Sequence, residues 1–424
     1  MRRSLILLAF SVLAACGRHN HVANVASTDI WPMFQRAPDH NAVLANQDLI
    51  ARWSLPAGAQ VNGGFALAGT TLFADTFGKE LLAIDARSGK VLWRAGADDV
   101  LMSTPVLGDG IVYVGSGTNA RLPSPQISRD PLHSGNLVWG RKEGNALYAF
   151  DARTGAQRWA FKTVGEDMPS PAIAGKTLVF ANGDFHAYGV DAATGKQLWQ
   201  RALIGPATMA SATLAEGLAY VSVCDYTWPY RCRTYALDPS SGAQRWSAPF
   251  GNSDASPAYG GGLLFVSNVE NAESEWQNRK AGRTVVTALD AKSGRARWTY
   301  RSSRVGPYTE VGSSERAIAG TYANGVYYQP VPTSDELIAF DARSGAVRWR
   351  FTSIAPIKMS PVIYRGKLYA GDTSGILYDL DASSGRVIKE VSFKEPFSVA
   401  PPLIVGNTMF IADGQTIYAI ALLS

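Results

Sequence analysis

The sequence has few charged residues, and this shortage excludes several classes of protein. Charged residues make up 18% of the 424 residues, and the Lys and Arg behind the net charge of +5 are scattered along the chain. A nucleic-acid-binding protein gathers its basic residues into a patch or stripe, so nucleic acid is not an expected partner. A chain that is 46% hydrophobic and low in charge is also a poor candidate for extensive disorder.

Histidine and cysteine are equally scarce, which leaves few candidates for catalysis or metal binding. Beyond the first thirty residues the only histidines are His40, His133 and His186, and none stands in a recognisable nucleophile motif. The chain has no Cys-x-x-Cys-His sequence that would attach a haem. We therefore assign no catalytic residue and no metal ligand from the sequence.

The sequence has no apolar run long enough to span a bilayer. Its longest apolar run stands at the start of the chain. Arg2 and Arg3 precede an apolar stretch from Leu5 to Leu13, which is too short to span a bilayer. The stretch ends in Leu13-Ala14-Ala15-Cys16-Gly17, which resembles a lipobox, the signal for cleavage before Cys16 and lipidation of that residue. An ordinary signal peptide with an incidental cysteine is the alternative. We predict a signal peptide over 1–15, a lipidated flexible tether over 16–30, and a periplasmic protein held at the outer membrane.

Only two cysteines remain in the predicted mature domain. Cys224 and Cys232 are close in sequence, and an even pair in an oxidising compartment is typical of a disulfide. A zinc site would need further ligands nearby, and the sequence supplies none there. We expect the pair to close one loop.

Glycine, tryptophan and tyrosine are abundant, and many of them belong to a repeat. The phrase Asp-x-x-(Ser/Thr)-Gly-x-x-x-Trp occurs six times, at 85–93, 151–159, 191–199, 238–246, 290–298 and 341–349. A seventh copy at 381–389 keeps Asp381 and Gly385 but ends in Lys389. Strand-like sequences flank each copy, so the phrase predicts a tight hairpin in which Asp caps the turn and Gly takes a positive φ.

The spacing of the hairpins predicts one closed ring for residues 31–424. A second hairpin lies upstream of each copy, so each unit has four short strands, here named A to D from the inside outwards. The last unit stops after its third strand, and the segment from Asp48 to Trp53 supplies a fourth strand with its Trp. The predicted fold is all-β: an eight-bladed β-propeller of four-stranded antiparallel blades, closed by pairing of the N- and C-terminal strands.

These repeats, with the opening Trp31-Pro32-Met33-Phe34-Gln35-Arg36, resemble the PQQ-like propeller repeat family. Among its branches, a compact single-propeller lipoprotein is most similar to BamB, the scaffold subunit of the outer-membrane β-barrel assembly machine. That resemblance implies a non-enzymatic, monomeric scaffold with protein partners and no cofactor. The other branch, the quinoprotein alcohol dehydrogenases, implies PQQ with calcium, but the adjacent cysteine pair typical of those enzymes is absent here. A propeller that binds envelope polymers is a third possibility.

The residues that do not repeat indicate where function lies. Long insertions fall in the B–C connections, at 117–145, 224–233, 268–283 and 329–336, so one face is decorated and the face of the A–B and C–D turns is bare. Aromatic and basic residues gather in three of these insertions, a composition typical of protein-binding surfaces. The candidate binding face consists of Trp139, Arg141, Lys142, Tyr226, Trp228, Tyr230, Trp276, Arg279 and Lys280.

The D–A connections lead towards the central channel and carry charged residues. The candidate channel mouth consists of Asp99, Asp167, Asp254, Glu310, Arg316 and Lys358. Such a ring could hold a metal and an anionic cofactor, as in the quinoproteins, or simply surround a solvated opening.

Overall fold

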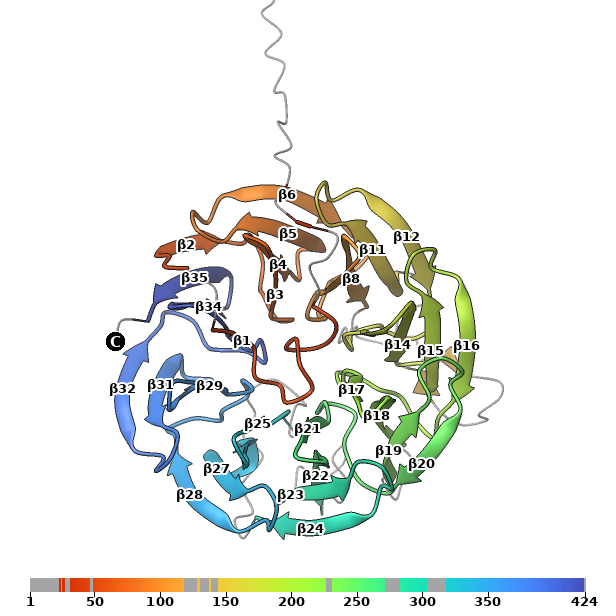
Figure 1. Ribbon diagram of the computed structural model, residues 1–424. Coiled ribbons are helices and arrows are strands. Elements are labelled where there is room, and N and C mark those ends of the chain that lie inside the picture. The colour runs from red at the N-terminus through yellow and green to blue at the C-terminus, as the bar shows by residue number, and fades with distance from the viewer. Residues whose placement is uncertain are drawn as a thin grey trace, which may run out of the picture.

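Eight antiparallel sheets form a closed ring around a central axis, which confirms the predicted eight-bladed propeller (Figure 1). This computed structural model describes residues 23, 25–26, 31–45, 49–117, 128–129, 137–138, 144–225, 231–270, 283–302 and 318–422. Among these residues the only helix is a single 3-10 turn, η1 (Pro332–Ser334), and no helix is long and apolar enough to cross a membrane.

Each blade contains four strands in the order A to D from the axis outwards. Blade 1 is β3 (Phe65–Ala68), β4 (Thr71–Asp75), β5 (Glu80–Asp85) and β6 (Val91–Gly96). Blade 2 is β7 (Val106–Gly108), β8 (Ile111–Ser116), β11 (Ala146–Asp151) and β12 (Gln157–Lys162), with the pair β9 (Ser128–Arg129) and β10 (Leu137–Val138) in its B–C insertion. Blade 3 is β13 (Ala172–Ala174), β14 (Thr177–Ala181), β15 (His186–Asp191) and β16 (Gln197–Ala202). Blade 4 is β17 (Thr213–Ala215), β18 (Leu218–Asp225), β19 (Arg231–Leu237) and β20 (Gln244–Ala248).

The second half of the ring repeats this plan. Blade 5 is β21 (Ala258–Gly260), β22 (Leu263–Glu270), β23 (Arg283–Asp290) and β24 (Ala296–Arg301). Blade 6 is β25 (Thr321–Ala323), β26 (Val326–Val331), β27 (Glu336–Asp341) and β28 (Val347–Thr352). Blade 7 is β29 (Val362–Tyr364), β30 (Lys367–Gly371), β31 (Ile376–Asp381) and β32 (Val387–Ser392). Blade 8 is β33 (Leu403–Val405), β34 (Thr408–Asp413), β35 (Thr416–Ala421) and the N-terminal β2 (Trp53–Pro56), and β1 (Val43–Leu44) adds a parallel edge to β33.

The repeated phrase forms the C–D turn of blades 1 to 7, as predicted. In blade 1, the Asp85 carboxylate accepts hydrogen bonds from the backbone N–H of Ser88 (2.8 Å) and from its hydroxyl (2.7 Å). Gly89 has a φ of 73° and donates its N–H to the Asp85 carbonyl at 2.8 Å. These contacts fix the turn locally, which explains why the sequence alone predicts it.

The tryptophan of each D strand packs on the turn of the next blade. Trp53 donates its indole N–H to the Ala86 carbonyl at 3.0 Å, and its ring lies against Gly89 of blade 1. Trp349 makes the same contacts with Ala382 (3.0 Å) and Gly385. A Cβ on either glycine would come within 3.0 Å of the indole ring, so the Gly and the Trp form one interlock between neighbouring blades.

The exception is Lys389 in β32, which takes the place of the tryptophan in blade 7. No turn glycine of the next blade is available to it. The next blade in the ring is blade 8, whose C and D strands come from opposite ends of the chain, so no C–D turn joins them. An indole at position 389 would therefore have no turn glycine to pack against. The loss of the Trp from the seventh copy follows from the way the ring is closed.

Closure occurs by antiparallel pairing of β2 with β35, with Trp53 opposite Ala419 and Pro56 opposite Thr416. This confirms the predicted pairing of the N- and C-terminal strands, with one difference in its bounds. The closing strand begins at Trp53 rather than ending there. The residues before it bond to the blade through Leu49, whose carbonyl accepts from the Asn407 N–H at 3.2 Å, and Ala51, whose N–H donates to the Thr408 hydroxyl at 2.9 Å.

The N-terminal segment 31–44, here called the plug, crosses the channel (Figure 1). It bonds to the free inner edges of the A strands, starting with the reciprocal Trp31–Leu107 backbone pair (2.7 and 2.8 Å). Further along, the carbonyls of Pro32, Pro38, Asp39 and Ala42 accept backbone N–H groups from β13, β21, β25 and β33. Since an unpaired strand edge leaves polar groups unsatisfied, the plug stabilises the innermost layer of the ring.

Candidate functional site

A small cavity lies on the axis of the propeller and has a volume of about 50 Å³. Phe34 of the plug lines it, together with residues from the D–A connections and starts of the A strands. The plug bonds to the middle residues of the A strands, whereas the D–A connections lie before the first residues of these strands. The cavity is therefore a funnel that has the plug as its floor and the D–A connections as its wall.

Structurally matching positions of the blades form the funnel wall. In six blades, the lining residue is the fourth before the first residue of the A strand, and blade 1 contributes the matching Asn62. The ring is Asn62, Met102, Met168, Met209, Asp254, Lys358 and Val399, with Ile318 completing it from blade 6. Two residues further along each connection, hydroxyl groups form a second ring, at Thr104, Ser170, Ser211, Ser256 and Ser360.

Hydrogen bonds from blade to blade hold the hydroxyl ring in place. The Ser170 N–H donates to the Ser211 hydroxyl, and the Ser211 N–H donates to the Ser256 hydroxyl, both at 2.9 Å. The Thr104 hydroxyl donates to the Gly63 carbonyl of blade 1. The serines that open the A strands therefore serve first to join neighbouring blades, which gives the funnel a rigid wall.

The funnel lies towards the face that carries the B–C connections. Backbone bonds join the two kinds of connection, for example from Gly117 N–H to the Val100 carbonyl (3.1 Å) and from Cys224 N–H to the Pro206 carbonyl (3.3 Å). On the other face the C–D turns bond to the A–B turns, as in the pair Ala152 N–H and Gly110 carbonyl at 2.9 Å. Backbone hydrogen bonds thus group the D–A with the B–C connections on one face and the C–D with the A–B turns on the other.

A buried carboxyl group, Glu166, lies beside the funnel wall. Neither of its carboxyl oxygens has a hydrogen-bond partner among the described residues. Burial, together with the negative charges of Asp254 and Asp167, raises the pKa of Glu166 to about 8. The side chain is consequently protonated at neutral pH, because a charged carboxylate without partners is costly in such a setting.

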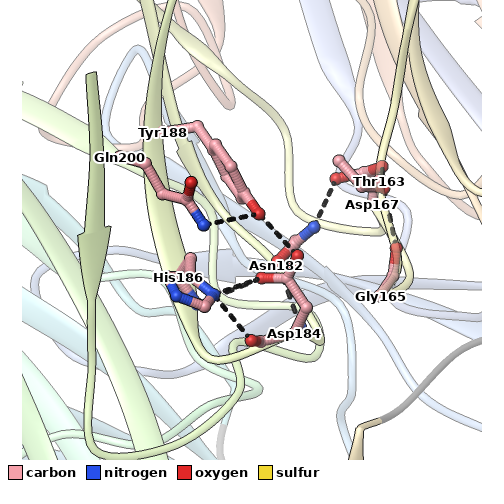
Figure 2. Close-up of polar contacts among 8 residues, drawn as sticks. All are labelled: Thr163, Gly165, Asp167, Asn182, Asp184, His186, Tyr188 and Gln200. Carbon is pink, nitrogen blue, oxygen red and sulfur yellow. Dashed lines mark hydrogen bonds and ion pairs between the residues drawn. The ribbon is translucent and has the colours of Figure 1, made fainter. Parts of the chain in front are cut away.

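The neighbouring Asp167 belongs to a polar network within blade 3 and its D–A connection (Figure 2). Its carboxylate accepts hydrogen bonds from the hydroxyl of Thr163 and from the side-chain amide of Asn182, the latter at 3.1 Å. Burial raises the pKa of Asp167 well above its usual range, against the opposing effect of these bonds. The network fastens the B–C turn of blade 3 to the connection that precedes its A strand.

The same network contains one of the three histidines of the propeller. The His186 ring contacts the Asp184 carbonyl at 2.8 Å, and the Tyr188 hydroxyl donates to the Asp184 carboxylate at 2.6 Å. The amide of Gln200 donates to the Tyr188 hydroxyl at 3.4 Å (Figure 2). These contacts hold a turn in shape and include no Ser or Cys nucleophile.

The structure places the predicted channel-mouth residues in different settings. Asp254 and Lys358 line the funnel. Asp99 and Asp167 do not line it: both are buried, and Asp99 accepts the backbone N–H of Val100 at 2.9 Å and lies 4.0 Å from the ammonium of Lys79. Glu310 and Arg316 lie outside the described residues. The sequence placed these acids in the D–A connections. It did not distinguish those that line the cavity from those that are buried behind its wall.

All nine residues of the candidate binding face lie outside the described residues, so that surface stays a prediction. The structure does describe the bases of two of the insertions that carry them. In blade 4, a disulfide joins Cys224 to Cys232 where β18 and β19 end, and Arg231 contacts Asp225 at 2.8 Å. In blade 5, Arg301 of β24 donates to both carboxylate oxygens of Glu270, at 3.0 and 3.1 Å.

The described residues do not fit PQQ with calcium. A site for an organic molecule of that class usually measures roughly 300–1,000 Å³, far more than this funnel provides. Among the described residues, no three His, Cys, Asp or Glu side chains are grouped in a way that could hold a metal ion. We derive no chemistry through that cofactor.

Comparison with known proteins identifies the family. The family model described as outer membrane protein assembly factor BamB matches residues 38–219, 207–350 and 333–423, which together cover nearly the whole propeller. The chain belongs to this family. The match confirms the resemblance to PQQ-like repeats and to BamB that the sequence indicated. BamB of Yersinia pestis is 21% identical over 440 residues, which cover 99% of each chain.

Other relatives of the family fold have different activities. Tetrathionate hydrolase of Acidithiobacillus ferrooxidans is 26% identical over 344 residues, which cover 78% of this chain and 66% of the hydrolase. This chain therefore matches slightly less than two thirds of that enzyme's length. The crystal structure of quinohemoprotein alcohol dehydrogenase from Comamonas testosteroni superposes with a TM-score of 0.67 at 15% identity, covering 94% of this chain and 81% of the other. This last likeness concerns the fold alone.

Proposed function

We propose that this protein is a non-enzymatic interaction scaffold that helps to assemble outer membrane proteins. In this proposal a lipid on Cys16 anchors it to the periplasmic face of the outer membrane, and protein partners bind the decorated face. Membership of the BamB family, with a match to a BamB over 99% of both chains, is the observation that carries the proposal.

The build of the decorated face supports a role in binding proteins. Blades 4 and 5 are neighbours, and each extends its B–C hairpin to strands of seven or eight residues. A disulfide braces the first hairpin and the Arg301–Glu270 pair braces the second. Bracing of this kind lowers the entropy lost when a loop is ordered on a partner, so loops on such supports favour binding.

Co-purification tests the proposal. We expect the lipidated protein, solubilised in mild detergent, to co-purify with components that assemble β-barrel proteins. Replacing Trp228 and Trp276 with Ala should reduce that recovery, while Arg343→Ala on a turn of the bare face should leave it unchanged. Recovery of no such component would contradict the proposed scaffold. Equal recovery with both variants would contradict its proposed binding face.

The anchor requires a separate test. Cys16→Ser should move the protein from the outer-membrane fraction to the soluble periplasmic fraction, because in this proposal the lipid on Cys16 holds it at the membrane. An unchanged distribution would show that Cys16 does not hold the protein at the membrane.

Hydrolysis of tetrathionate is a second candidate, favoured by the similarity to tetrathionate hydrolase and by the position of Lys358. The ammonium group of Lys358 supplies a positive charge that can pair with a sulfur oxyanion. Incubation of the purified protein with tetrathionate, followed by ion chromatography, decides between the two. Consumption of tetrathionate that Lys358→Ala abolishes would favour the hydrolase; no consumption would remove this candidate.

A further inference from the structure

Three of the chain's seven methionines lie side by side on the funnel wall. Met102, Met168 and Met209 occupy the same position in blades 2, 3 and 4, the fourth residue before each A strand. Neighbouring A strands contact one another in the order β7, β13, β17, so the three side chains form a continuous arc around the axis.

The composition of the ring shows that this position does not need methionine for packing. The other five blades contribute Asn62, Asp254, Ile318, Lys358 and Val399 to this ring. Met168 is buried, but Met102 and Met209 are only half-buried, whereas Met359 and Met409, which do pack in the core, are fully buried. The arc therefore presents thioethers to the cavity rather than filling a hole in the core.

The chemistry around the arc selects the kind of ligand. Thioether sulfur is a soft, uncharged donor that prefers Cu(I) to Mg²⁺, Ca²⁺ or other hard cations. Asp254 follows Met209 in the ring and places a carboxylate beside the arc, while Lys358 lies in blade 7, across the axis from Met168 of blade 3. A cavity of about 50 Å³ has room for an ion but not for an organic cofactor.

We propose that the funnel binds one Cu(I) ion through the sulfur atoms of Met102, Met168 and Met209. Asp254 offsets the charge of the ion from the adjacent blade, and Phe34 of the plug closes the floor beneath it. This site is independent of the proposed scaffold function, since it involves the axis of the ring and none of the B–C insertions.

Competition for Cu(I) tests the proposal on the full mature chain with Cys16 replaced by Ser to avoid lipidation. The protein is titrated under anaerobic conditions with ascorbate against the Cu(I) chelator bicinchoninate, whose copper complex is coloured. We expect one equivalent to be withdrawn from the chelator. Replacing any one of the three methionines with Ile should weaken binding at least tenfold, and Zn²⁺ should not compete.

Two sets of variants separate this site from other sources of binding. Met359→Leu and Met409→Leu change buried methionines outside the funnel and should leave affinity unchanged. His19→Ala with His21→Ala removes the histidines of the tether, and the binding of one equivalent should persist. Absence of Cu(I) binding, or equal binding by the Met102→Ile/Met168→Ile/Met209→Ile variant, overturns the proposal.

X-ray absorption at the copper edge covers the case in which the triple variant does not fold. A sulfur shell around copper bound to the chain without tether histidines supports the thioether site. A shell of nitrogen and oxygen alone overturns it.

Discussion

At the scale of single residues, the contact between a tryptophan and a turn glycine decides how neighbouring blades join. The turn Asp is occupied by contacts within its own hairpin: in blade 6, hydrogen bonds from Arg348 and then from Ser344 hold the pKa of Asp341 below its usual range. Gly385 has a φ of 71°, and its ideal Cβ would lie 2.5 Å from an atom of the Trp349 ring. Two separate requirements, backbone conformation and close approach, therefore select glycine at this position.

Gly385→Ala and Gly366→Ala separate these two requirements within one blade. Gly366 also has a positive φ, 77°, but nothing lies within 4 Å of its ideal Cβ. We expect Gly366→Ala to lower the free energy of unfolding by about 1–2 kcal/mol through backbone strain alone. Gly385→Ala should cost about 2–4 kcal/mol, because overpacking against the indole is added. Urea unfolding measures both, and equal losses would show that the interlock contributes nothing.

Glu166 gives a pH dependence that its sequence position does not reveal. Its pKa is about 8 in the folded protein and 4.5 in an ordinary setting, so folding favours the protonated form. Its effect on stability therefore becomes unfavourable as pH rises from about 4.5 to 8, at roughly 1.4 kcal/mol for each pKa unit.

Glu166→Gln removes this penalty. We expect the variant to be more stable than the parent protein at pH 8.5 and nearly equal to it at pH 5, as measured by urea unfolding at both values. Glu390→Gln, on the exposed outer strand of blade 7, serves as the control and should change neither. A difference that is the same at both pH values would contradict the assignment.

At the scale of elements, the hairpins follow from the sequence and the plug does not. The C–D turn depends on contacts between residues three to five positions apart, so its Asp, Ser and Gly reveal it directly. His40 in the plug instead contacts Thr213 and Thr321, 173 and 281 residues away. The plug also holds Gln35, Arg36 and His40 at positive φ, which no local pattern indicates. Long-range contacts of this kind are invisible in a single sequence.

The plug should loosen in acid because His40 is fully buried. Burial lowers the pKa of His40 to about 3, against 6.5 in an ordinary setting. The neutral ring is thus favoured in the fold, and its contribution to stability is present above about pH 6.5 and is lost as pH falls towards 3. We expect His40→Gln to reduce the loss of stability between pH 6.5 and 4. Thr213→Ala, which leaves the ring buried, should keep the loss; urea unfolding across this range checks both.

Lys389 tests the explanation for the missing tryptophan. We expect Lys389→Trp to give no gain in the free energy of unfolding, because blade 8 offers no turn glycine to receive the indole. Trp349→Lys, at the matching position of blade 6, should cost about 3 kcal/mol or more, as the loss of a large buried aromatic does. A clear stabilisation by Lys389→Trp would show that some other surface accepts the ring.

At the scale of the whole molecule, the two ends of the chain hold the ring closed. The repeats and the incomplete last unit predict eight blades and their closure, because both follow from counting strands. The candidate site was predictable only in part. The sequence placed Asp254 and Lys358 at the channel but grouped Asp99 and Asp167 with them. A single sequence does not show which of these side chains are buried and which line the cavity. The methionine arc appears only when the blades are superposed on one another.

Removing the C-terminal strand β35 should affect the whole ring rather than blade 8 alone. Truncation after Asp413 deletes β35, which leaves β2 without a partner and β34 paired only with β33. We expect this variant to lose cooperative unfolding, as followed by circular dichroism, and to be cleaved rapidly by proteases. Truncation after Leu422 should behave like the full chain, and a cooperative transition in the shorter variant would show that the ring tolerates an open end.

The first described residue of the chain, Ala23, limits how far the propeller could stand from the proposed anchor at Cys16. Ala23 is buried and donates its N–H to the Arg153 carbonyl at 2.9 Å, in the C–D turn of blade 2 on the bare face. Six residues lie between it and Cys16, so the two Cα atoms can be at most about 25 Å apart in an extended chain. A lipid on Cys16 would therefore be joined by a short tether to one side of the propeller. The bare face would stay near the bilayer at that edge, and the decorated face would be directed away from the lipid.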